Sequence, residues 1–508
     1  MSVSSAIDAL FAKWTGADTP GAVVGVTRHG QILHEAAYGM ADIAQSVKLD
    51  RRSVLRIGSQ SKQFTVLLAL LLEAEGKLSL DDEVHRHAPW LPAYPAPITL
   101  RQMAGNTSGL RDFLEILVWS GLPLSAPSTR QTSRDLLGRH AEVNYPPDTE
   151  MLYSNTGFFL LSEIIEEVSG RSFNELLADY ITGPLGMTDT SLQINDADIL
   201  PRLAEQHIRG ADGRWQTTAW GFPLGGEGGM VSSLRDMLTW QANLAKPIAA
   251  HAAALAGMQA PRHYRNGAET LYRLGLAGDV YRGLRSIGHG GGTAGCKSEG
   301  MRFPDQALGI VILGNAAELT PFTMARRIAD LALADEMQPL PDPAPHRRLV
   351  ESAGFYRHVG GDDLIEICTD GSLTSAGGNV SLLQTSPGEF EPERVTMHLT
   401  FRQDGDELDA MWCGAKRRYR RLATPPAGRN ITGHYVNAQL GLDAQVTAAT
   451  ALQIRSDHGT FNASLSWIAD DLLLVHGAAR AWIATLSVSA DGLVLTSDRT
   501  KQLRLKPA

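Results

Sequence analysis

The sequence predicts an α+β protein in which a mixed N-terminal domain is followed by two small antiparallel β-barrel domains. Strand patterns stand at both ends of the first 335 residues, and helical periodicity fills the middle. Beyond a proline-rich break, short strands alternate with turn pairs such as Asp370–Gly371 and Asp404–Gly405, and long helical patterns are absent. A chain of 508 residues with 43% hydrophobic residues is large enough for about two to four domains with separate cores.

The N-terminal domain is predicted to span residues 1–335. Gly21–Gly39 combines β-branched residues with a His-Gly turn, which indicates a β-hairpin. Gly157–Gly170 has apolar residues at helical spacing and ends in glycine, so it predicts a helix. Strand patterns return near Ile287 as two or three short antiparallel strands, and residues 323–337 are predicted to close the domain as a helix.

A proline-rich segment separates this domain from the rest of the chain. Residues 336–346 contain four prolines, which cannot continue a helix or a central strand, so the segment is predicted to be a linker. A weak repeat follows, in which "AGFYRH" resembles "TGHYVN" and the two glycines, Gly354 and Gly433, lie 79 positions apart. The repeat predicts two β-barrels, at 347–425 and 426–508, because closing a sheet removes its exposed edges. One larger β domain is the alternative.

The composition excludes several classes of function. The net charge is −9 and basic residues occur only in short clusters such as Lys416–Arg421, so no nucleic-acid partner is expected. The cysteines are three in number and far apart, which argues against a disulfide framework or a thiolate metal site. His85 and His87 lie two positions apart near a proline and are interpreted as surface residues rather than metal ligands. No metal or other cofactor is therefore expected.

The N-terminus and the hydropathy pattern predict where the protein is found. The first twenty residues lack the basic and apolar regions of a signal peptide. The apolar run Val66–Leu72 is far too short to cross a bilayer. With its few scattered cysteines, the chain is predicted to be a soluble protein of the reducing cytoplasm, without a membrane partner.

The stretch "IGSQSKQFTVLLALLL" places Ser59 three residues before Lys62, at the start of an apolar run. If a helix begins there, the lysine lies one turn on and on the same face, where its amine can approach the serine hydroxyl. A serine is a weak nucleophile until a base takes its proton, and a lysine can do so when its pKa is lowered. Ser-x-x-Lys is common by chance, so the pair alone is better explained by an ordinary buried helix.

Two further stretches add to this pair. "LYSNTG" contains Tyr153–Asn155 before the predicted helix, and "SIGHGGGTAG" contains His289–Gly291 on a predicted strand. In this order the three motifs resemble the signatures of the serine β-lactamase and penicillin-binding-protein superfamily. "MAGNTSGLRDF", "PLGMTDTSL" and "GGEGGMVSSLRDMLTW" are similar to supporting stretches of the same superfamily, and the resemblance covers roughly residues 1–335. It implies a β-lactamase-like domain: an antiparallel sheet flanked by helices beside a helical lobe, with the active site between the two.

The resemblance also implies roles for the motif residues. Ser59 is the nucleophile that becomes acylated, and Lys62 accepts its proton. Tyr153 shares a proton with Lys62 and passes it to the leaving group. Asn155 hydrogen-bonds the lysine and the substrate carbonyl. The alternatives are structural, since Tyr153 fits an ordinary core tyrosine and Asn155 fits a helix N-cap.

The third motif is expected to complete the site. His289 lies across the cleft and orients the phenol or a substrate group, although a purely structural role is the alternative. The backbone N–H groups of Ser59 and Gly292 form the oxyanion hole, and Gly291 borders the substrate. Removing one oxyanion donor typically costs about 3 kcal/mol of transition-state stabilisation.

Departures from the superfamily pattern narrow the substrate. Gly290 occupies the position where β-lactamases and carboxypeptidases carry a threonine that helps to bind a substrate carboxylate. A site for a C-terminal carboxylate is therefore disfavoured, and so is β-lactamase activity. Esterases of the superfamily often carry tryptophan at the position of His289, which weakens an esterase interpretation without excluding it.

A catalytic domain followed by two β-barrels resembles the bacterial D-aminopeptidase family. In that family a loop of the last β domain enters the active site and limits substrate length, and acidic side chains meet the substrate amine. Glu227, a lone carboxylate in the glycine-rich turn "LGGEGGMVSS", is the candidate for the amine, because an ammonium and a carboxylate form charge-assisted hydrogen bonds. A solvated loop glutamate is the alternative. Residues 429–508 match the family's loop region poorly, which puts the exact substrate in doubt.

These observations predict an enzyme, a serine hydrolase that works through a Ser59 acyl-enzyme. The expected reaction is release of an N-terminal D-amino acid or glycine from short peptides and amides, with a small peptide or amide as the only required partner. A homodimer is possible by analogy with the family. The alternatives are an esterase or amidase of the same superfamily, and a penicillin-recognising or ligand-sensing protein that acylates without turnover.

Overall fold

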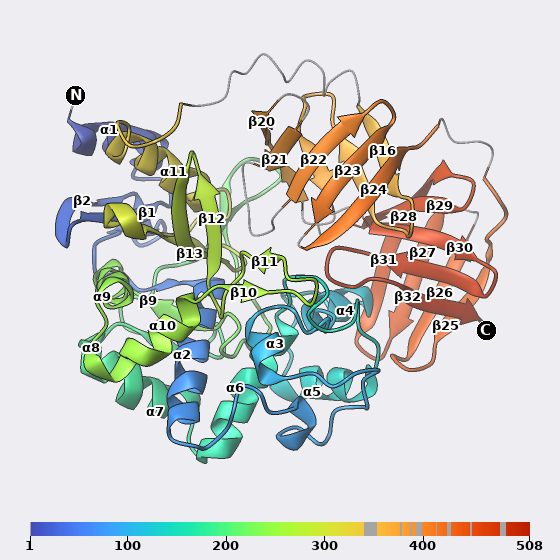
Figure 1. Cartoon of the computed structure of the whole chain (residues 1–508), viewed down its shortest axis with the longest axis horizontal. Coiled ribbons are helices and arrows are strands. Elements are labelled where there is room, and N and C mark those ends of the chain that lie inside the picture. Colours follow the sequence, from blue (N-terminus) through green and yellow to red (C-terminus); the bar gives the residue numbers. More distant parts are fainter. Residues whose placement is uncertain are drawn as a thin grey trace.

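The computed structural model describes residues 2–339, 353–375, 378–386, 389–392, 399–412, 414–423, 428–447, 450–477 and 484–508. Its N-terminal domain is an antiparallel sheet with helices on both faces and a helical lobe beside it, and two all-β units follow (Figure 1). The α+β fold class predicted from the sequence is confirmed. Most of the predicted linker, residues 336–346, lies outside the described residues.

The central sheet has the strand order β12-β13-β14-β15-β1-β2, and all neighbouring strands are antiparallel. Its strands are β1 Ala22–Arg28, β2 Gln31–Tyr38, β12 Ala277–Tyr281, β13 Leu284–Gly292, β14 Lys297–Phe303 and β15 Leu308–Gly314. The predicted N-terminal hairpin and the strands after Ile287 are confirmed. Strands β1 and β15, from the two ends of the domain, pair in the middle of the sheet. The helical lobe is formed by the chain between them.

Both faces of this sheet are covered by helices. Ile310 packs with α1 (Val3–Leu10) and α11 (Pro321–Ala332), whereas Val311 belongs to the core shared with α9 (Leu234–Ala245) and the helical lobe. Successive side chains of a strand point to opposite faces, so a strand covered on both sides is apolar throughout. All seven residues of β15 are accordingly buried.

The helical lobe packs around α2 and α6, which lie side by side. Its helices are α2 Ser61–Ala74, α3 Leu100–Ala104, α4 Phe113–Trp119, α5 Arg130–Arg139, α6 Thr156–Ser169, α7 Phe173–Leu177 and α8 Gly183–Leu185, with α10 Ala252–Gln259 beside α2. The predicted helix at Gly157–Gly170 is α6. It ends at Gly170 in the left-handed conformation that commonly terminates helices.

Short strands connect the lobe to the sheet. The pairs are β3 Met40–Asp42 with β4 Val47–Lys48, β7 His207–Arg209 with β8 Trp215–Thr217, and β10 Arg262–His263 with β11 Glu269–Thr270. A three-stranded sheet consists of β5 Leu55–Arg56, β9 Met230–Ser232 and β6 Ser191–Leu192. The β5–β9 pairing brings the glycine-rich turn around Glu227 next to the start of α2.

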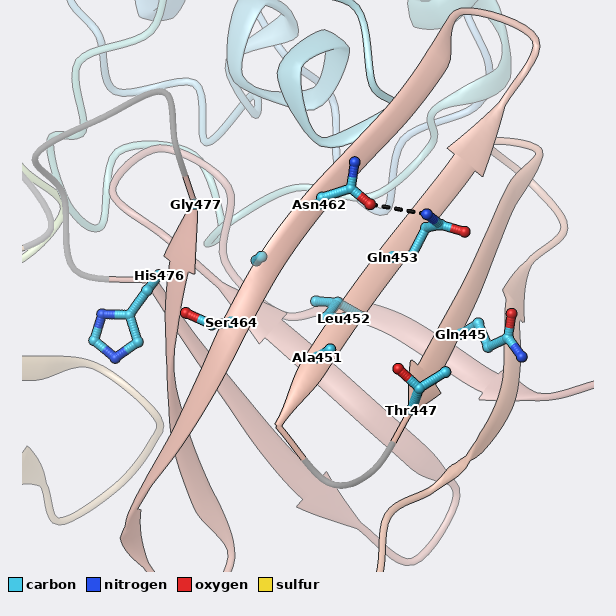
Figure 2. Close-up of a pocket in the computed structure, with 10 residues that line it drawn as sticks. Gln445, Thr447, Ala451, Leu452, Gln453, Asn462, Ser464, His476 and Gly477 are labelled. Carbon is cyan, nitrogen blue, oxygen red and sulfur yellow. Dashed lines mark hydrogen bonds between the residues drawn. The ribbon is translucent and has the colours of Figure 1, made fainter.

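The second β unit is a closed barrel of eight strands, as predicted. Its strands are β25 Gly433–Asn437, β26 Leu442–Thr447, β27 Ala451–Ser456, β28 Gly459–Ala469, β29 Leu472–Gly477, β30 Ala484–Ser489, β31 Gly492–Thr496 and β32 Leu503–Pro507. Inward residues alternate with outward ones, and β26 is buried at every second position. A shallow polar hollow lies on the outer face of β26–β29, where Gln453 Nε2 donates to Asn462 Oδ1 at 2.8 Å (Figure 2).

The first β unit is a nine-stranded antiparallel sheet with the order β19-β18-β17-β16-β24-β23-β22-β21-β20. Its strands are β16 Gly354–His358, β17 Leu364–Ile367, β18 Leu373–Ser375, β19 Gly378–Val380, β20 Leu382–Ser386, β21 Glu389–Pro392, β22 Leu399–Asp404, β23 Glu407–Trp412 and β24 Ala415–Arg421. The sequence predicts a closed barrel here, but the two end strands are not paired within the described residues. Only Ser381 separates β19 from β20, which is too short for an antiparallel hairpin.

Charged side chains join the three parts of the chain. Arg417 of the first β unit pairs with Glu150 of the N-terminal domain and with Asp363. Lys501 of the barrel lies 2.9 Å from the same Asp363 carboxylate. Partial burial raises the pKa of this half-buried carboxyl, but the charges of Lys501 and Arg417 lower it to about 2. The first β unit therefore contacts the N-terminal domain beside the segment that leads to Tyr153, and the barrel contacts the first β unit at the same place.

Within the described ranges, every helix falls short of the length and apolar character that a membrane crossing requires. The same ranges contain no group of three or more His, Cys, Asp or Glu side chains placed to share a metal ion.

Candidate active site

The turn that carries Ser59 is packed against the end of β13. Ser59 lies in a short 3-10 turn, Gly58–Gln60, directly before α2. Gly58 has φ +54°, and a Cβ there would lie 2.5 Å from the backbone nitrogen of Gly292. A Cβ on Gly291 would lie 1.9 Å from the carbonyl oxygen of Ile57. Both positions therefore require glycine, and the predicted oxyanion donor Gly292 N lies against the nucleophile turn.

Lys62 is fully buried and points its amine at three oxygen atoms. The Nζ atom lies 3.1 Å from Ser59 Oγ, 2.8 Å from Asn155 Oδ1 and 2.5 Å from the carbonyl oxygen of Glu227. It also lies 4.8 Å from the centre of the Tyr153 ring. The structure thus brings four of the predicted residues to a single amine.

The environment makes this amine suitable as a base. Burial lowers the pKa of Lys62 to about 7; the charges of Glu227 and Asp112 raise it, and that of Arg499 lowers it further. About half of the molecules then carry a neutral amine at neutral pH. In that form two N–H groups can donate to Asn155 and to the Glu227 carbonyl, and the lone pair faces the hydroxyl of Ser59.

Asp112 fixes the orientation of Asn155. The backbone N and the side-chain Nδ2 of Asn155 both donate to Asp112 Oδ2 at 2.8 Å. The carboxylate caps α4 by accepting from Glu115 N at 3.2 Å. Because Asp112 holds the amide nitrogen, the amide oxygen of Asn155 is the atom that faces Lys62.

Tyr153 is held from both sides by Asn106. Ser154 N donates to Asn106 Oδ1 at 3.0 Å, and Leu152 N donates to the Asn106 carbonyl at 3.1 Å. The phenol oxygen is buried and makes no hydrogen bond of normal geometry within the described residues. Burial raises the pKa of Tyr153, while the Ser59 hydroxyl lowers it, so the phenol is protonated at neutral pH.

His289 is paired with a second phenol rather than with Tyr153. Its Nδ1 lies 2.6 Å from the carbonyl oxygen of Gly290, and its Nε2 lies 3.0 Å from Tyr272 Oη. A carbonyl only accepts, so Nδ1 carries the proton and Nε2 accepts from Tyr272. Burial, followed by the charge of Lys62, lowers the pKa of His289 to about 3, and the ring is neutral. The Tyr153 and His289 ring centres lie 5.9 Å apart.

Glu227 is buried, with only 1% of its surface exposed, so it is not the solvated loop glutamate of the alternative. Its carboxylate accepts from Gly225 N at 2.8 Å, and its second oxygen makes no hydrogen bond within the described residues. Burial raises the pKa of this carboxyl. The backbone carbonyl of Glu227, not its side chain, contacts Lys62 Nζ.

Several residues of the site were not singled out from the sequence. Asn106 and Asp112 lie inside the stretch "GNTSGLRDF", whose similarity to the superfamily could have identified them. Tyr272 stands in no motif. Neither does Arg499, which lies between β31 and β32 of the closed barrel and places its guanidinium carbon 5.0 Å from the centre of the Tyr153 ring.

The contact of Lys62 with Ser59 is the geometry expected of a serine nucleophile beside a lysine base. The model of the family described as Beta-lactamase matches residues 7–334, which is more than half of the chain. The chain therefore belongs to the beta-lactamase family.

Curated relatives named D-aminopeptidase match more than half of the chain. A D-aminopeptidase of Cereibacter sphaeroides is 30% identical over 311 residues, which cover 61% of this chain and 59% of the relative. A D-aminopeptidase of Brucella ovis is 26% identical over 411 residues, covering 77% of this chain and 73% of the relative. The match to the first of these spans less than two thirds of that relative's length.

Solved structures support the same fold. The octameric penicillin-binding protein homologue from Pyrococcus abyssi aligns with a TM-score of 0.58 at 21% identity, covering 82% of this chain and 99% of that one. D-amino acid amidase from Ochrobactrum anthropi SV3, in complex with D-phenylalanine, aligns with a TM-score of 0.55 at 25% identity, covering 66% and 99%.

Proposed function

We propose that this enzyme is an aminopeptidase that releases an N-terminal D-amino acid or glycine from short peptides and amides through an acyl-enzyme on Ser59. The observation that carries the proposal is the buried amine of Lys62, 3.1 Å from Ser59 Oγ, with a pKa near 7. The relatives named D-aminopeptidase and the D-amino acid amidase support the substrate class.

Acylation begins with attack of Ser59 Oγ on the amide carbonyl. The hydroxyl proton passes to the neutral amine of Lys62 as the carbon–oxygen bond forms. The N–H groups of Ser59 and Gly292 donate to the developing oxyanion. The proton then moves from Lys62, by way of the Tyr153 phenol, to the leaving amine as the carbon–nitrogen bond breaks.

Deacylation uses the same groups in reverse. A water molecule attacks the ester carbonyl and gives its proton to the Lys62–Tyr153 pair. The pair returns a proton to Ser59 Oγ as the acyl–oxygen bond breaks. Lys62 is then again the neutral base from which the cycle starts.

The charges around the site favour a substrate with a free amine. The buried carboxyl groups within electrostatic reach of Lys62 or of Arg499 are Asp112, Glu115, Glu227 and Asp498. In their ionised form these carboxyl groups favour a cationic substrate group over an anionic one. A Cβ on Gly290 would lie 2.8 Å from a carboxyl oxygen of Glu299, so the position used for carboxylate binding in carboxypeptidases lies here beside an acidic side chain.

Hydrolysis of D-Ala, L-Ala and Gly p-nitroanilides, each with a free and an acetylated amine, tests the proposal. We expect activity on free-amine D-Ala and Gly substrates that disappears in Ser59→Ala and on acetylation. Intact mass spectrometry of a rapidly quenched reaction should detect the acyl adduct on the wild type only. Activity that is equal on free and acetylated amines but is lost in Ser59→Ala would favour an esterase or general amidase. Adduct without turnover would favour a ligand-sensing protein.

Glu227→Gln tests the predicted contact with the substrate amine. The amide retains an oxygen for Gly225 N and leaves the carbonyl contact with Lys62 in place. If the carboxylate attracts the ammonium, KM rises for the free-amine substrates. The plateau rate of Ser59 labelling by a neutral fluorophosphonate, measured well above the pKa of Lys62, stays unchanged, while the acidic limb moves to lower pH because the Glu227 charge raises that pKa. An equal loss on both would assign Glu227 a structural role.

A further inference from the structure

The loop Ser497–Gln502 between β31 and β32 of the barrel is bonded to the N-terminal domain through its backbone. Asp112 N and Asn144 Nδ2 both donate to the carbonyl of Arg499, at 3.2 and 2.9 Å. Arg499 N and Ser497 Oγ donate to Glu115 Oε2, at 3.0 and 2.7 Å. These bonds hold the Arg499 backbone at the start of α4, the helix that Asp112 caps.

We propose that Arg499, which the closed barrel supplies, is a positioning residue of the catalytic centre and acts on Lys62 through Tyr153 and Asp112. Its role in catalysis rests on the proposed hydrolase function. A purely structural loop would hold the two domains together without influencing the proton transfer between Ser59 and Lys62.

The geometry links Arg499 to the nucleophile in two ways. The Tyr153 ring has two cations near its centre: the guanidinium carbon of Arg499 at 5.0 Å and the amine of Lys62 at 4.8 Å. Cations at such distances are attracted by an aromatic ring, so both hold the phenol in place.

The second link is a chain of polar contacts. Arg499 Nη1 lies 3.7 Å from Asp112 Oδ2, the atom that accepts both N–H groups of Asn155. Asn155 in turn accepts from Lys62, and Lys62 Nζ contacts Ser59. The chain therefore connects the barrel loop to the nucleophile in four steps.

The charge of Arg499 favours the neutral form of the Lys62 amine, which is the form that can accept a proton. It lowers the pKa of Lys62 and of Tyr153, although burial is the largest influence on each. The charged groups that face Lys62 are Glu227, Arg499 and Asp112. The groups that face Arg499 are Asp498, Asp112, Tyr153 and Glu115. Removing the guanidinium also removes the cation that lies 3.7 Å from Asp112, which favours protonated Lys62 still more.

The test compares Arg499→Gln and Arg499→Lys with a matched control, Arg504→Gln. Arg504 lies on β32, and its 63% exposed side chain is 4.0 Å from Glu142 of the N-terminal domain. The first readout is the pH dependence of Ser59 labelling by a neutral fluorophosphonate, which does not depend on recognition of a substrate amine. The second is the pKa of Lys62, from NMR of protein labelled with [13Cε]lysine and assigned with Lys62→Met.

In Arg499→Gln we expect the acidic limb of the labelling profile, and the pKa of Lys62, to rise on the order of one pH unit. At pH 7 the neutral fraction of the amine, and with it the labelling rate, then falls about fivefold. Arg499→Lys keeps the charge and should recover most of the profile. The labelling profile and the Lys62 pKa of Arg504→Gln should be the same as those of the wild type.

Two results would overturn the inference, and a third would separate it from the proposed function. An acidic limb and a Lys62 pKa that are the same in Arg499→Gln and wild type would overturn the inference. A uniform loss of labelling at every pH with an unchanged Lys62 pKa would also overturn it, since that pattern reports structure alone. If wild-type Ser59 is not labelled, the proposed function fails, and the NMR titration still decides whether Arg499 sets the pKa of Lys62.

Discussion

Lys62 Nζ lies 3.1 Å from Ser59 Oγ, and both side chains come from one turn of backbone at the start of α2. Helix geometry alone accounts for this proximity, since residues three apart lie on the same face. In the proposed mechanism, burial of the amine is what makes Lys62 a base for Ser59, because burial lowers its pKa.

The rate of acylation should therefore rise with pH through about 7. The pKa of Lys62 is lowered by burial to about 7, and only the neutral amine can accept the serine proton. Activity is low below this pH and gained above it. A pH profile of kcat/KM and of fluorophosphonate labelling checks this. Lys62→Met should reduce labelling on the order of 10³-fold at all pH values, and a variant that labels at the wild-type rate would exclude lysine as the base.

Asp112→Asn should have two separable effects. The substituted amide no longer offers a carboxylate to the two N–H groups of Asn155, so Asn155 is less well oriented and the plateau rate falls by roughly tenfold. Loss of the Asp112 charge removes an influence that raises the pKa of Lys62, so the acidic limb moves to lower pH. The control is Asp212→Asn, which removes a carboxylate that is paired with Arg214 on the surface. A limb that moves upward would contradict this account.

Tyr272→Phe should raise the pKa of His289. The Tyr272 hydroxyl donates to Nε2 and so stabilises the neutral ring. Without it the pKa moves up from about 3 by on the order of one unit. Nitrogen-15 NMR of the imidazole at a series of pH values measures this shift. Tyr281→Phe, whose hydroxyl donates to Asp330 instead, should leave His289 unchanged. An identical His289 titration in both variants would remove Tyr272 from the site.

Gly58→Ala should lower the free energy of unfolding by more than the left-handed backbone conformation of Gly58 explains. Gly58 and Gly30 both have positive φ, but a Cβ at Gly30 meets nothing within 4 Å, whereas one at Gly58 collides with Gly292. Gly30→Ala should therefore lower the free energy of unfolding by about 1 kcal/mol and leave Ser59 labelling intact. Gly58→Ala should destabilise further and reduce labelling at least tenfold. Equal behaviour of the two variants would show that the close approach of β13 is unimportant.

The sequence predicts the parts of the site that local geometry determines. Ser59 and Lys62 are neighbours in any helix that starts there, whereas the roles of Tyr153, Asn155 and His289 come only from the resemblance to a known family. Their partners depend on tertiary packing: Tyr272 reaches His289 across the sheet edge, and Arg499 lies 440 positions from Ser59 (499 − 59). No local pattern marks either residue.

In the fold, too, local patterns predict some elements, whereas others depend on tertiary packing. The hairpin of β1 and β2 and the helix α6 follow from alternation, helical spacing and glycine stops in short stretches. Closure of a β sheet depends instead on how its end strands meet. The barrel of β25–β32 closes, while the nine-stranded sheet does not within the described residues. The single residue between β19 and β20 explains why these strands do not form a hairpin, but their bounds are known only from the structure.

The long separation of Ser59 and Arg499 has a consequence for synthesis. A ribosome makes the whole N-terminal domain, with its nucleophile and base, before it reaches the loop at Ser497–Gln502, and domains fold as they emerge. A nascent chain at this stage contains Ser59 and Lys62 but lacks the guanidinium beside Tyr153. If Arg499 acts on Lys62 as proposed, the amine of such a chain holds its proton more tightly, and the growing chain is a weaker hydrolase at neutral pH than the finished protein.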